Sequence, residues 1–122
     1  MSNQPMSNIK IEVIHGGLGF EKNSLELPPI LHETTNATGI KHMNGTISMA
    51  RIEPGGASSE IFICINDQPE LNYGGIRNID GQGFAAFGKV IKGLNVVKEI
   101  HSLPQKDQFL NKEVKVNSIK RI

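Results

Sequence analysis

The sequence predicts one mainly β domain, residues 1–122, built as a barrel with one short helix near its C-terminus. Three observations favour this class. Short runs of residues alternate between apolar and polar side chains, as in half-buried strands. Long stretches rich in the 13 glycines and 6 prolines separate these runs. Tight hairpin signals are sparse, which favours a barrel over a sandwich.

The N-terminal half contains two predicted strands and a long connection. In residues 9–13, alternate side chains share one apolar face: Ile9, Ile11 and Val13. Residues 46–51 form the next strand, with Ile47 and Met49 predicted to point inward. Residues 20–45 are interrupted by Gly, Pro and Asn, so we expect an irregular connection with at most one short strand or turn.

The C-terminal half contains two more strands and the helix. Residues 60–65 are apolar on both faces, which predicts a central strand. Residues 84–91 form another strand, in which Gly88 indicates a bend or a bulge. Residues 93–101 carry apolar side chains at helical spacing and are closed by Pro104, which predicts a short amphipathic helix.

The overall charge is nearly balanced, with 13 Lys and Arg against 12 Asp and Glu. A chain without a large field of either sign is not expected to bind nucleic acid or to coat an anionic membrane. No apolar run approaches the roughly 20 residues of a membrane-spanning helix, so the expected location is cytoplasmic. The single cysteine, Cys64, lies in an apolar run and is expected to be a buried, unreactive thiol.

No cofactor and no metal ion are expected. His32 and His42 lack the spacing of metal ligands on a helix, and no Cys or Asp cluster joins them, so we expect them to have structural or surface roles. The glycines of residues 74–83 lack the strand–loop–helix context and the lysine of a phosphate-binding loop. A nucleotide site is therefore not predicted.

Three motifs occur in a fixed order: GTISMAR at residues 45–51, ASSEIFIC at 57–64 and FAAFGKVIKGLNVV at 84–97. They resemble consecutive signatures of the cyclophilin family of peptidyl-prolyl isomerases, G-x-[IL]-S-M-A-[NR], S-Q-F-F-I and F-G-K-V-x-x-G-[ML]-x-V-V. The resemblance covers about residues 9–122. It implies a cofactor-free isomerase that aids protein folding by rotating X–Pro bonds in proline-containing peptides or unfolded proteins.

The resemblance also implies a substrate groove. One wall corresponds to Met49, Ala50 and Arg51, whose backbone would pair with an extended peptide. An apolar pocket for the proline ring is implied at four positions: Val13, Phe62, Leu71 and Phe84. His15 stands where the family has a glutamine that contacts substrate, and Glu60 replaces another glutamine along the groove.

The chemistry implied by the resemblance is rotation about an amide bond, against a barrier of about 18–20 kcal/mol. The twisted transition state has lost conjugation, so its prolyl nitrogen can accept a hydrogen bond. In the family the donor is an arginine in an F-[HY]-R motif, just upstream of the motif that matches residues 12–17 here. This chain has no such motif, so its catalytic residue is unassigned. Arg51 is either a substitute donor or, as we prefer, a solvated cation at the end of a strand.

The resemblance implies that the first two strands and the first helix of the barrel are missing. The predicted final strand, residues 114–122 with a bulge near Asn117, would then lack a neighbour and leave an open edge. A second copy of the chain or a complementing segment would complete that edge. Three functions stay open: an active isomerase, a non-catalytic proline-peptide binding module in the same groove, and an inactive truncated product.

Overall fold

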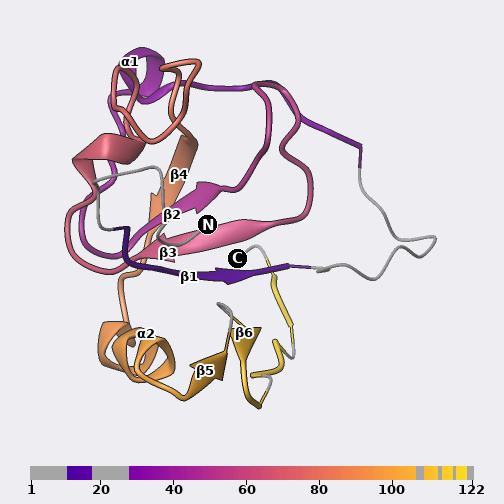
Figure 1. Cartoon of the computed structure of the whole chain (residues 1–122), viewed down its shortest axis with the longest axis vertical. Helices are drawn as coiled ribbons and strands as arrows, with labels where there is room; N and C mark the ends of the chain where they lie inside the picture. The colour runs from indigo at the N-terminus through magenta and orange to yellow at the C-terminus, as the bar shows by residue number, and fades with distance from the viewer. Residues whose placement is uncertain (1–10, 18–27, 107–108, 113, 117, 121–122) are drawn as a thin grey trace.

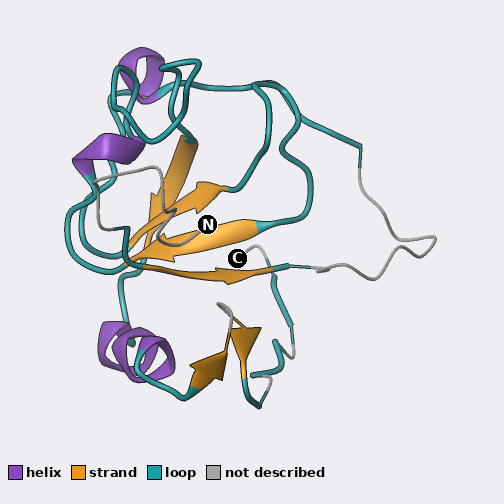
Figure 2. Ribbon diagram, in the orientation of Figure 1, coloured by secondary structure: helices purple, strands orange, loops and turns teal. Residues whose placement is uncertain are grey.

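A computed structural model describes residues 11–17, 28–106, 109–112, 114–116 and 118–120. These residues form an antiparallel sheet of four strands, a separate pair of very short strands, and a few short helices joined by long loops (Figures 1 and 2). The elements after β4 form the lower part of the molecule in Figure 1. The mainly β class predicted from the sequence is confirmed.

The elements have the following bounds. The strands are β1 (Val13–Gly16), β2 (Thr46–Met49), β3 (Ile61–Cys64), β4 (Ala85–Lys89), β5 (Gln105–Lys106) and β6 (Phe109–Leu110). The helices are α1 (Thr35–Thr38), α2 (Leu94–His101) and the 3₁₀ turn η1 (Pro69–Leu71). None of the described helices is long and apolar enough to cross a bilayer.

The four-stranded sheet has the order β1-β3-β2-β4 with every neighbouring pair antiparallel. The predicted central strand is confirmed, because β3 pairs with β1 on one side and β2 on the other. Phe62 and Cys64 of β3 are completely buried, which explains why this segment is apolar on both faces. Among the described strands the sheet is open, with β1 and β4 at its edges, so a closed barrel is not formed.

The first strand lies further along the chain than predicted. Strand β1 begins at Val13, where the expected strand of residues 9–13 ends, and Ile9 lies outside the described residues. The register fixes this position, because Val13 pairs with Cys64 and His15 with Phe62. Ile11 is nevertheless 3% exposed and belongs to the core, as its apolar face predicts.

The inward face of β2 was predicted wrongly. Thr46 and Ser48 are the buried residues of this strand, whereas Ile47 and Met49 are only half-buried. Burial of a hydroxyl is tolerated when the hydroxyl has a hydrogen-bond partner. The Thr46 Oγ1 donates to the Lys41 carbonyl (3.1 Å), and the Ser48 Oγ lies 2.8 Å from the Nε2 of His42.

Strand β4 contains the predicted irregularity near Gly88. Ile47 pairs with Gly88 and the next residue, Ser48, pairs with Ala86, so Phe87 is an additional residue in β4. This is the geometry of a β-bulge, in which one residue of the longer strand has no direct partner. The side chain of Phe87 is 54% exposed, so the bulge turns this ring out of the core.

The predicted C-terminal helix is confirmed as α2, which follows Gly93 in the left-handed region (φ +88°) and buries Val97. A strand was expected at residues 114–122, but the described residues of that segment form no strand, so this prediction is wrong for them. A strand requires a neighbour for its backbone groups, and no described segment pairs with this one. The bulge expected near Asn117 lies outside the described residues.

The long connection of residues 20–45 contains one turn of helix, α1, where at most a strand or turn was predicted. Thr34 caps the helix, because its side-chain oxygen accepts a hydrogen bond from the backbone N–H of Ala37 (3.1 Å). Gly39 ends it in the left-handed region at φ +79°, a conformation that glycine adopts without strain. Residues 18–27 lie outside the described part of the chain.

Candidate functional site

The apolar candidates of the predicted groove are in the core. Phe62 and Leu71 are 0% exposed and Phe84 is 1% exposed. The rings of Phe62 and Phe84 meet edge to face, with centroids 5.3 Å apart and planes at 84°. Val13 packs against the same cluster. The structure therefore brings these four residues together, and a substrate proline could reach the Phe62 ring only after the atoms that cover it move.

The predicted groove wall is held by the sheet. Met49 of β2 lies opposite Ile61 of β3 and is half-buried, and Ala50 is 8% exposed. The backbone N–H of Ala50 donates to the carbonyl of Glu60 (2.9 Å), which extends the β2–β3 pairing beyond the strand ends. That hydrogen bond connects two of the predicted groove positions directly. It also occupies the backbone N–H of Ala50, so this group is not free to pair with a peptide.

Arg51 was expected to be solvated, and this expectation is wrong. Arg51 is 8% exposed, and its side chain points into the fold rather than into water. It donates to Asp80 through Nη1 (2.8 Å to Oδ2) and Nη2 (3.0 Å to Oδ1). It also donates to the carbonyl of Gly83 through Nε (3.1 Å) and Nη2, and to the carbonyl of Ile52 through Nη1 (3.2 Å). All five N–H groups of the guanidinium therefore have acceptors.

These contacts fasten the loop before β4 to the end of β2. Hydrogen bonds from Arg51 and from the backbone N–H of Gln82 lower the pKa of Asp80, so its carboxylate stays charged. The Arg51 guanidinium also lies over the Phe84 ring, 5.3 Å from the centroid, in a cation–π contact. Because every donor is occupied, Arg51 has no N–H directed at a substrate in this structure.

His15 and Glu60 form a contact at the edge of the sheet. The Nε2 of His15 lies 3.3 Å from the Oε1 of Glu60, and their side chains are 38% and 29% exposed. Ser59 donates a further hydrogen bond from its Oγ to the Oε2 of Glu60 (3.2 Å). Burial lowers the pKa of His15, and the nearby Glu60 carboxylate opposes this by raising it. Two of the predicted groove positions, His15 and Glu60, are thus in direct contact.

His42 organises a buried polar network that the sequence did not predict. Asn72 Oδ1 accepts from the backbone N–H of His42 (2.8 Å), and this fixes which end of the amide is oxygen. The same oxygen lies 2.7 Å from His42 Nδ1, so Nδ1 carries the proton and Nε2 accepts from the Ser48 hydroxyl. The ring also stacks on Phe62 at 5.9 Å. Burial lowers the pKa of His42, against the Asn72 hydrogen bond that raises it.

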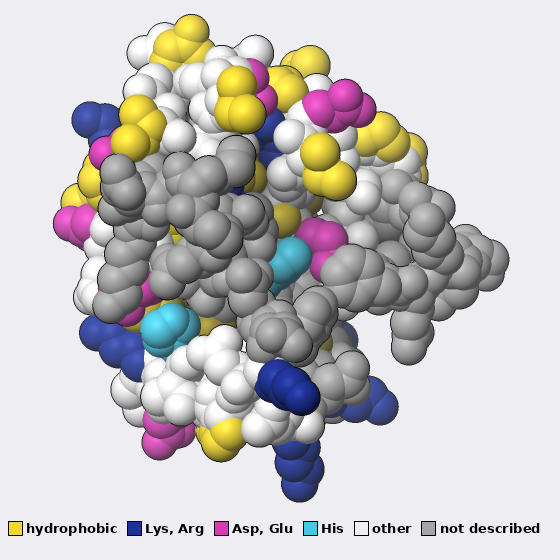
Figure 3. Space-filling view, viewed as in Figure 1, with side chains coloured by type: hydrophobic (Ala, Val, Ile, Leu, Met, Phe, Trp, Pro, Cys, Tyr) yellow, Lys and Arg dark blue, Asp and Glu magenta, His cyan; other side chains and the backbone are white. Residues whose placement is uncertain are grey.

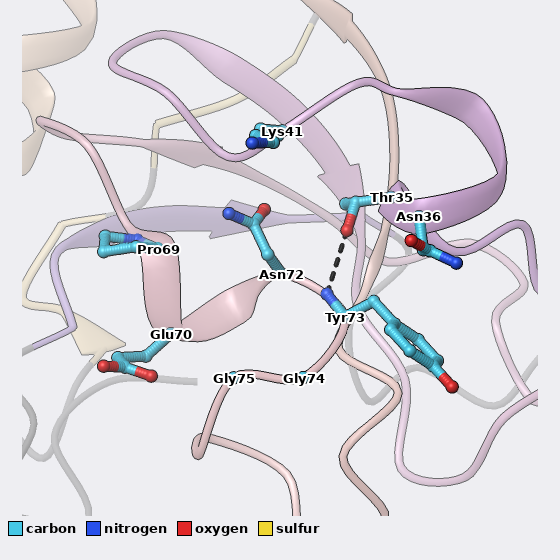
Figure 4. A pocket seen from close by; sticks show the side chains of 9 residues that line it. All are labelled: Thr35, Asn36, Lys41, Pro69, Glu70, Asn72, Tyr73, Gly74 and Gly75. Carbon is cyan, nitrogen blue, oxygen red and sulfur yellow. Dashed lines mark hydrogen bonds between the residues drawn. The ribbon is translucent and has the colours of Figure 1, made fainter.

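A polar pocket lies beside α1 and η1 (Figure 4). The residues around it are Thr35, Asn36, Lys41, Pro69, Glu70, Asn72, Tyr73, Gly74 and Gly75. One wall is fixed by the backbone N–H of Tyr73, which donates to the Thr35 hydroxyl (2.9 Å). Asn72 connects this wall to the His42 network. None of the predicted groove residues contributes to this pocket, and no sequence motif indicated it.

The described residues offer little for nucleophilic or metal chemistry. No three His, Cys, Asp or Glu side chains among them lie close enough together to bind a metal ion. Cys64 is free and completely buried, as predicted. Burial, with a smaller contribution from Asp67, raises the pKa of this thiol to about 12. The thiolate that would act as a nucleophile is therefore scarce at neutral pH.

Comparison with known proteins identifies the family. Residues 4–121 match the family described as cyclophilin type peptidyl-prolyl cis-trans isomerase/CLD. The match covers more than half of the chain and agrees with the three ordered motifs and with the mainly β sheet. The chain belongs to the cyclophilin-type peptidyl-prolyl cis-trans isomerase family.

Individual relatives support the same assignment. A peptidyl-prolyl cis-trans isomerase of Acinetobacter baylyi is 37% identical over 114 residues, which are 90% of this chain and 57% of that protein. Peptidyl-prolyl cis-trans isomerase B of Escherichia coli is 37% identical over 92 residues, 72% of this chain and 54% of that protein. Peptidyl-prolyl cis-trans isomerase A of Dickeya dadantii is 39% identical over 92 residues, 72% of this chain and 45% of that protein. The chain spans about half the length of these relatives.

Proposed function

We propose that this chain is a peptidyl-prolyl cis-trans isomerase of the cyclophilin type that binds proline-containing peptides or unfolded proteins. The observation that carries the proposal is the family match over residues 4–121, together with relatives that are named as isomerases. The proposed groove comprises the nine positions described above, from Val13 on β1 to Phe84 before β4. We also propose that residues 1–122 act as one domain.

The proposed chemistry needs neither a nucleophile nor a cofactor. An isomerase binds the twisted amide more tightly than the planar one, by holding the proline ring and directing a hydrogen-bond donor at its nitrogen. The apolar cluster of Phe62, Leu71 and Phe84 supplies side chains suited to a proline ring. A cluster that is buried in the free protein must open to accept a ligand, so substrate binding would include a local rearrangement.

The second candidate is a binding module without catalysis. It is favoured by one observation, that all five N–H groups of Arg51 are engaged by Asp80, Gly83 and Ile52. A donor for the prolyl nitrogen would have to come from elsewhere, or Arg51 would have to break the ion pair with Asp80. The third candidate, an inert chain, would neither bind nor catalyse.

A protease-coupled assay separates these candidates. Chymotrypsin cleaves only the trans form of Ala-Ala-Pro-Phe-p-nitroanilide, so the slow phase of cleavage reports isomerisation. The proposed isomerase should raise the rate of that phase in proportion to its concentration. The E. coli relative, assayed in parallel, serves as the reference for this rate. An unchanged slow phase would refute catalysis, and a parallel NMR titration with the same peptide would then distinguish a binding module from an inert chain.

We make two further proposals, on the partners of the open sheet and on the location of the protein. The open sheet leaves edge strands whose backbone groups can pair with another strand, from a second copy or from a complementing segment. We propose that such pairing completes the fold. We also propose a cytoplasmic location, which a buried free cysteine in a reduced state supports.

A further inference from the structure

The near balance of charge over the whole chain conceals a strong segregation along it. Residues 89–121 contain eight of the 13 Lys and Arg but only three of the 12 Asp and Glu. The remaining residues contain the other five basic and nine acidic side chains. Figure 3 shows the consequence, because several lysine side chains lie at the lower end of the molecule, where Figure 1 places α2, β5 and β6.

The basic side chains of this end are exposed. We call it the C-terminal basic surface and define it by its exposed lysines: Lys92, Lys98, Lys106, Lys112, Lys115 and Lys120. Among the described residues from 89 to 120, Glu99 is the one acidic side chain. No ion pair of these lysines is found among the described residues.

Exposed aliphatic side chains lie between the last three of these lysines, Lys112, Lys115 and Lys120. Val114 is 47% exposed, Val116 is 64% exposed and Ile119 is 80% exposed, and the described residues around them pair with none of the described strands. A row of lysines that were only solvating the surface would not need aliphatic residues between them. Such residues lower the solubility of a free surface and lower the free energy of a complex that covers them.

We infer that the C-terminal basic surface docks an extended acidic polypeptide segment that carries apolar side chains at alternate positions. The carboxylates of such a segment would contact the lysines, and its apolar side chains would cover Val114, Val116 and Ile119. An added strand would also pair with the backbone groups of Val114, Lys115 and Val116, as in recognition by strand addition. This docking is independent of the proline groove, because it requires no proline and uses none of the groove residues.

Nucleic acid fits this surface less well than an acidic peptide. All its described cations are lysines, whereas bidentate phosphate recognition favours arginine. Nucleic-acid bases stack on aromatic rings, whereas the exposed large apolar residues described between 90 and 120 are aliphatic: Ile91, Val96, Leu103, Val114, Val116 and Ile119. The exposed aliphatic side chains would find no apolar partner on a phosphate backbone. A carboxylate-rich peptide satisfies both the lysines and the aliphatic residues.

The test is an NMR titration of the full chain with four probes of equal length: the peptides (Glu-Val)₅, (Glu-Ser)₅ and (Lys-Val)₅ and a single-stranded oligonucleotide. We expect (Glu-Val)₅ to bind most tightly and to shift the amide signals of residues 112–120 rather than those around Phe62. Binding should weaken as salt rises, because exposed charges are screened. The (Glu-Ser)₅ peptide should bind several-fold more weakly, since it lacks the apolar side chains.

Matched charge reversals complete the test. Lys115→Glu should weaken (Glu-Val)₅ binding by about three- to fivefold, which is the effect of losing one exposed ion pair. The loss should be larger if Lys115 contacts two carboxylates. Lys41→Glu reverses another exposed lysine, which lies at the polar pocket, and should change the affinity less than about twofold. The inference is overturned if the two variants behave alike, if the oligonucleotide binds more tightly than (Glu-Val)₅, or if no probe shifts residues 112–120. Self-association that Lys115→Glu abolishes would also overturn it, in favour of a second copy as the occupant.

Discussion

The guanidinium of Arg51 and the carboxylate of Asp80 form a two-point ion pair, with N–O distances of 2.8 and 3.0 Å, across 29 residues of sequence. The Arg51 side chain is fully buried, while that of Asp80 is 30% exposed. The pair therefore joins a core position to a surface loop. It also gives the loop before β4 its position, because Arg51 binds the Gly83 carbonyl at the same time.

Removing Arg51 should destabilise the fold. We expect Arg51→Ala to lower the free energy of unfolding by about 2–4 kcal/mol, because it leaves the Gly83 carbonyl without a buried donor and removes the contact with Phe84. Lys89→Ala removes an exposed cation of β4 and serves as the control, with an expected change below about 0.5 kcal/mol. Urea unfolding followed by circular dichroism measures both. Equal losses in the two variants would show that the buried pair has no special role.

The loop before β4 also depends on two glycines that differ in their surroundings. Gly83 has φ +63°, and a Cβ there would lie 2.6 Å from the carbonyl carbon of Asn72. Gly81 has a similar φ of +70°, but a Cβ there would meet no atom within 4 Å. Gly81→Ala should therefore lower the stability by only about 1 kcal/mol, the strain of a left-handed alanine. Gly83→Ala adds overpacking and should lower it by at least about 1–3 kcal/mol more.

Thermal unfolding of these two variants tests the packing of the loop directly. The expected order is wild type, then Gly81→Ala, then Gly83→Ala, with the larger drop in Tm at the last step. A Gly83→Ala protein as stable as Gly81→Ala would contradict the close approach of Gly83 to the backbone of η1 and Asn72.

The buried imidazole of His42 predicts a loss of stability in acid. Its folded-state pKa lies below the ordinary value of 6.5, so the unfolded chain binds a proton more readily than the native protein. Stability contributed by neutral His42 is therefore complete above pH 6.5 and declines as the pH falls towards the folded-state pKa. Urea midpoints between pH 7.5 and 5 should decrease for the wild type and decrease less steeply for His42→Gln. Identical slopes would exclude His42 as the titrating group.

The contact between His15 and Glu60 predicts a charge preference in the proposed groove. With the pKa of His15 lowered, the pair carries a net negative charge near neutral pH. Ala-Lys-Pro-Ala should then bind about three- to fivefold more tightly than Ala-Glu-Pro-Ala at pH 7.5. Glu60→Gln should abolish the preference, and Glu99→Gln, on the exposed face of α2, should keep it. A preference that survives Glu60→Gln would have another source.

Local patterns were sufficient to predict some elements and not others. The apolar run of β3 and the helical spacing of α2 are properties of adjacent residues, and both predictions are confirmed. The inward face of β2 depends instead on His42, whose ring reaches Ser48 from a preceding loop. Alternation alone favoured Ile47 and Met49, because no local signal shows that a buried hydroxyl will find a partner.

The same distinction applies to the candidate site. Motif order was sufficient to identify the family, and the family match confirms it. The burial of Arg51 was not predictable, because its partner Asp80 lies in a loop that is far away in the sequence. The charge segregation was readable from the sequence, but a total count of Lys, Arg, Asp and Glu averages it away. The fold then gathers the basic residues at one end (Figure 3).

Two-dimensional exchange NMR on Ala-Ala-Pro-Phe, with and without the protein, tests the central claim most directly. Uncatalysed exchange between the cis and trans forms takes tens of seconds, so cross-peaks between them are absent at sub-second mixing times. The proposed isomerase predicts that these cross-peaks appear when the protein is added. Peptide signals that shift or broaden without cross-peaks would contradict catalysis and leave a binding module, and unchanged signals would contradict both.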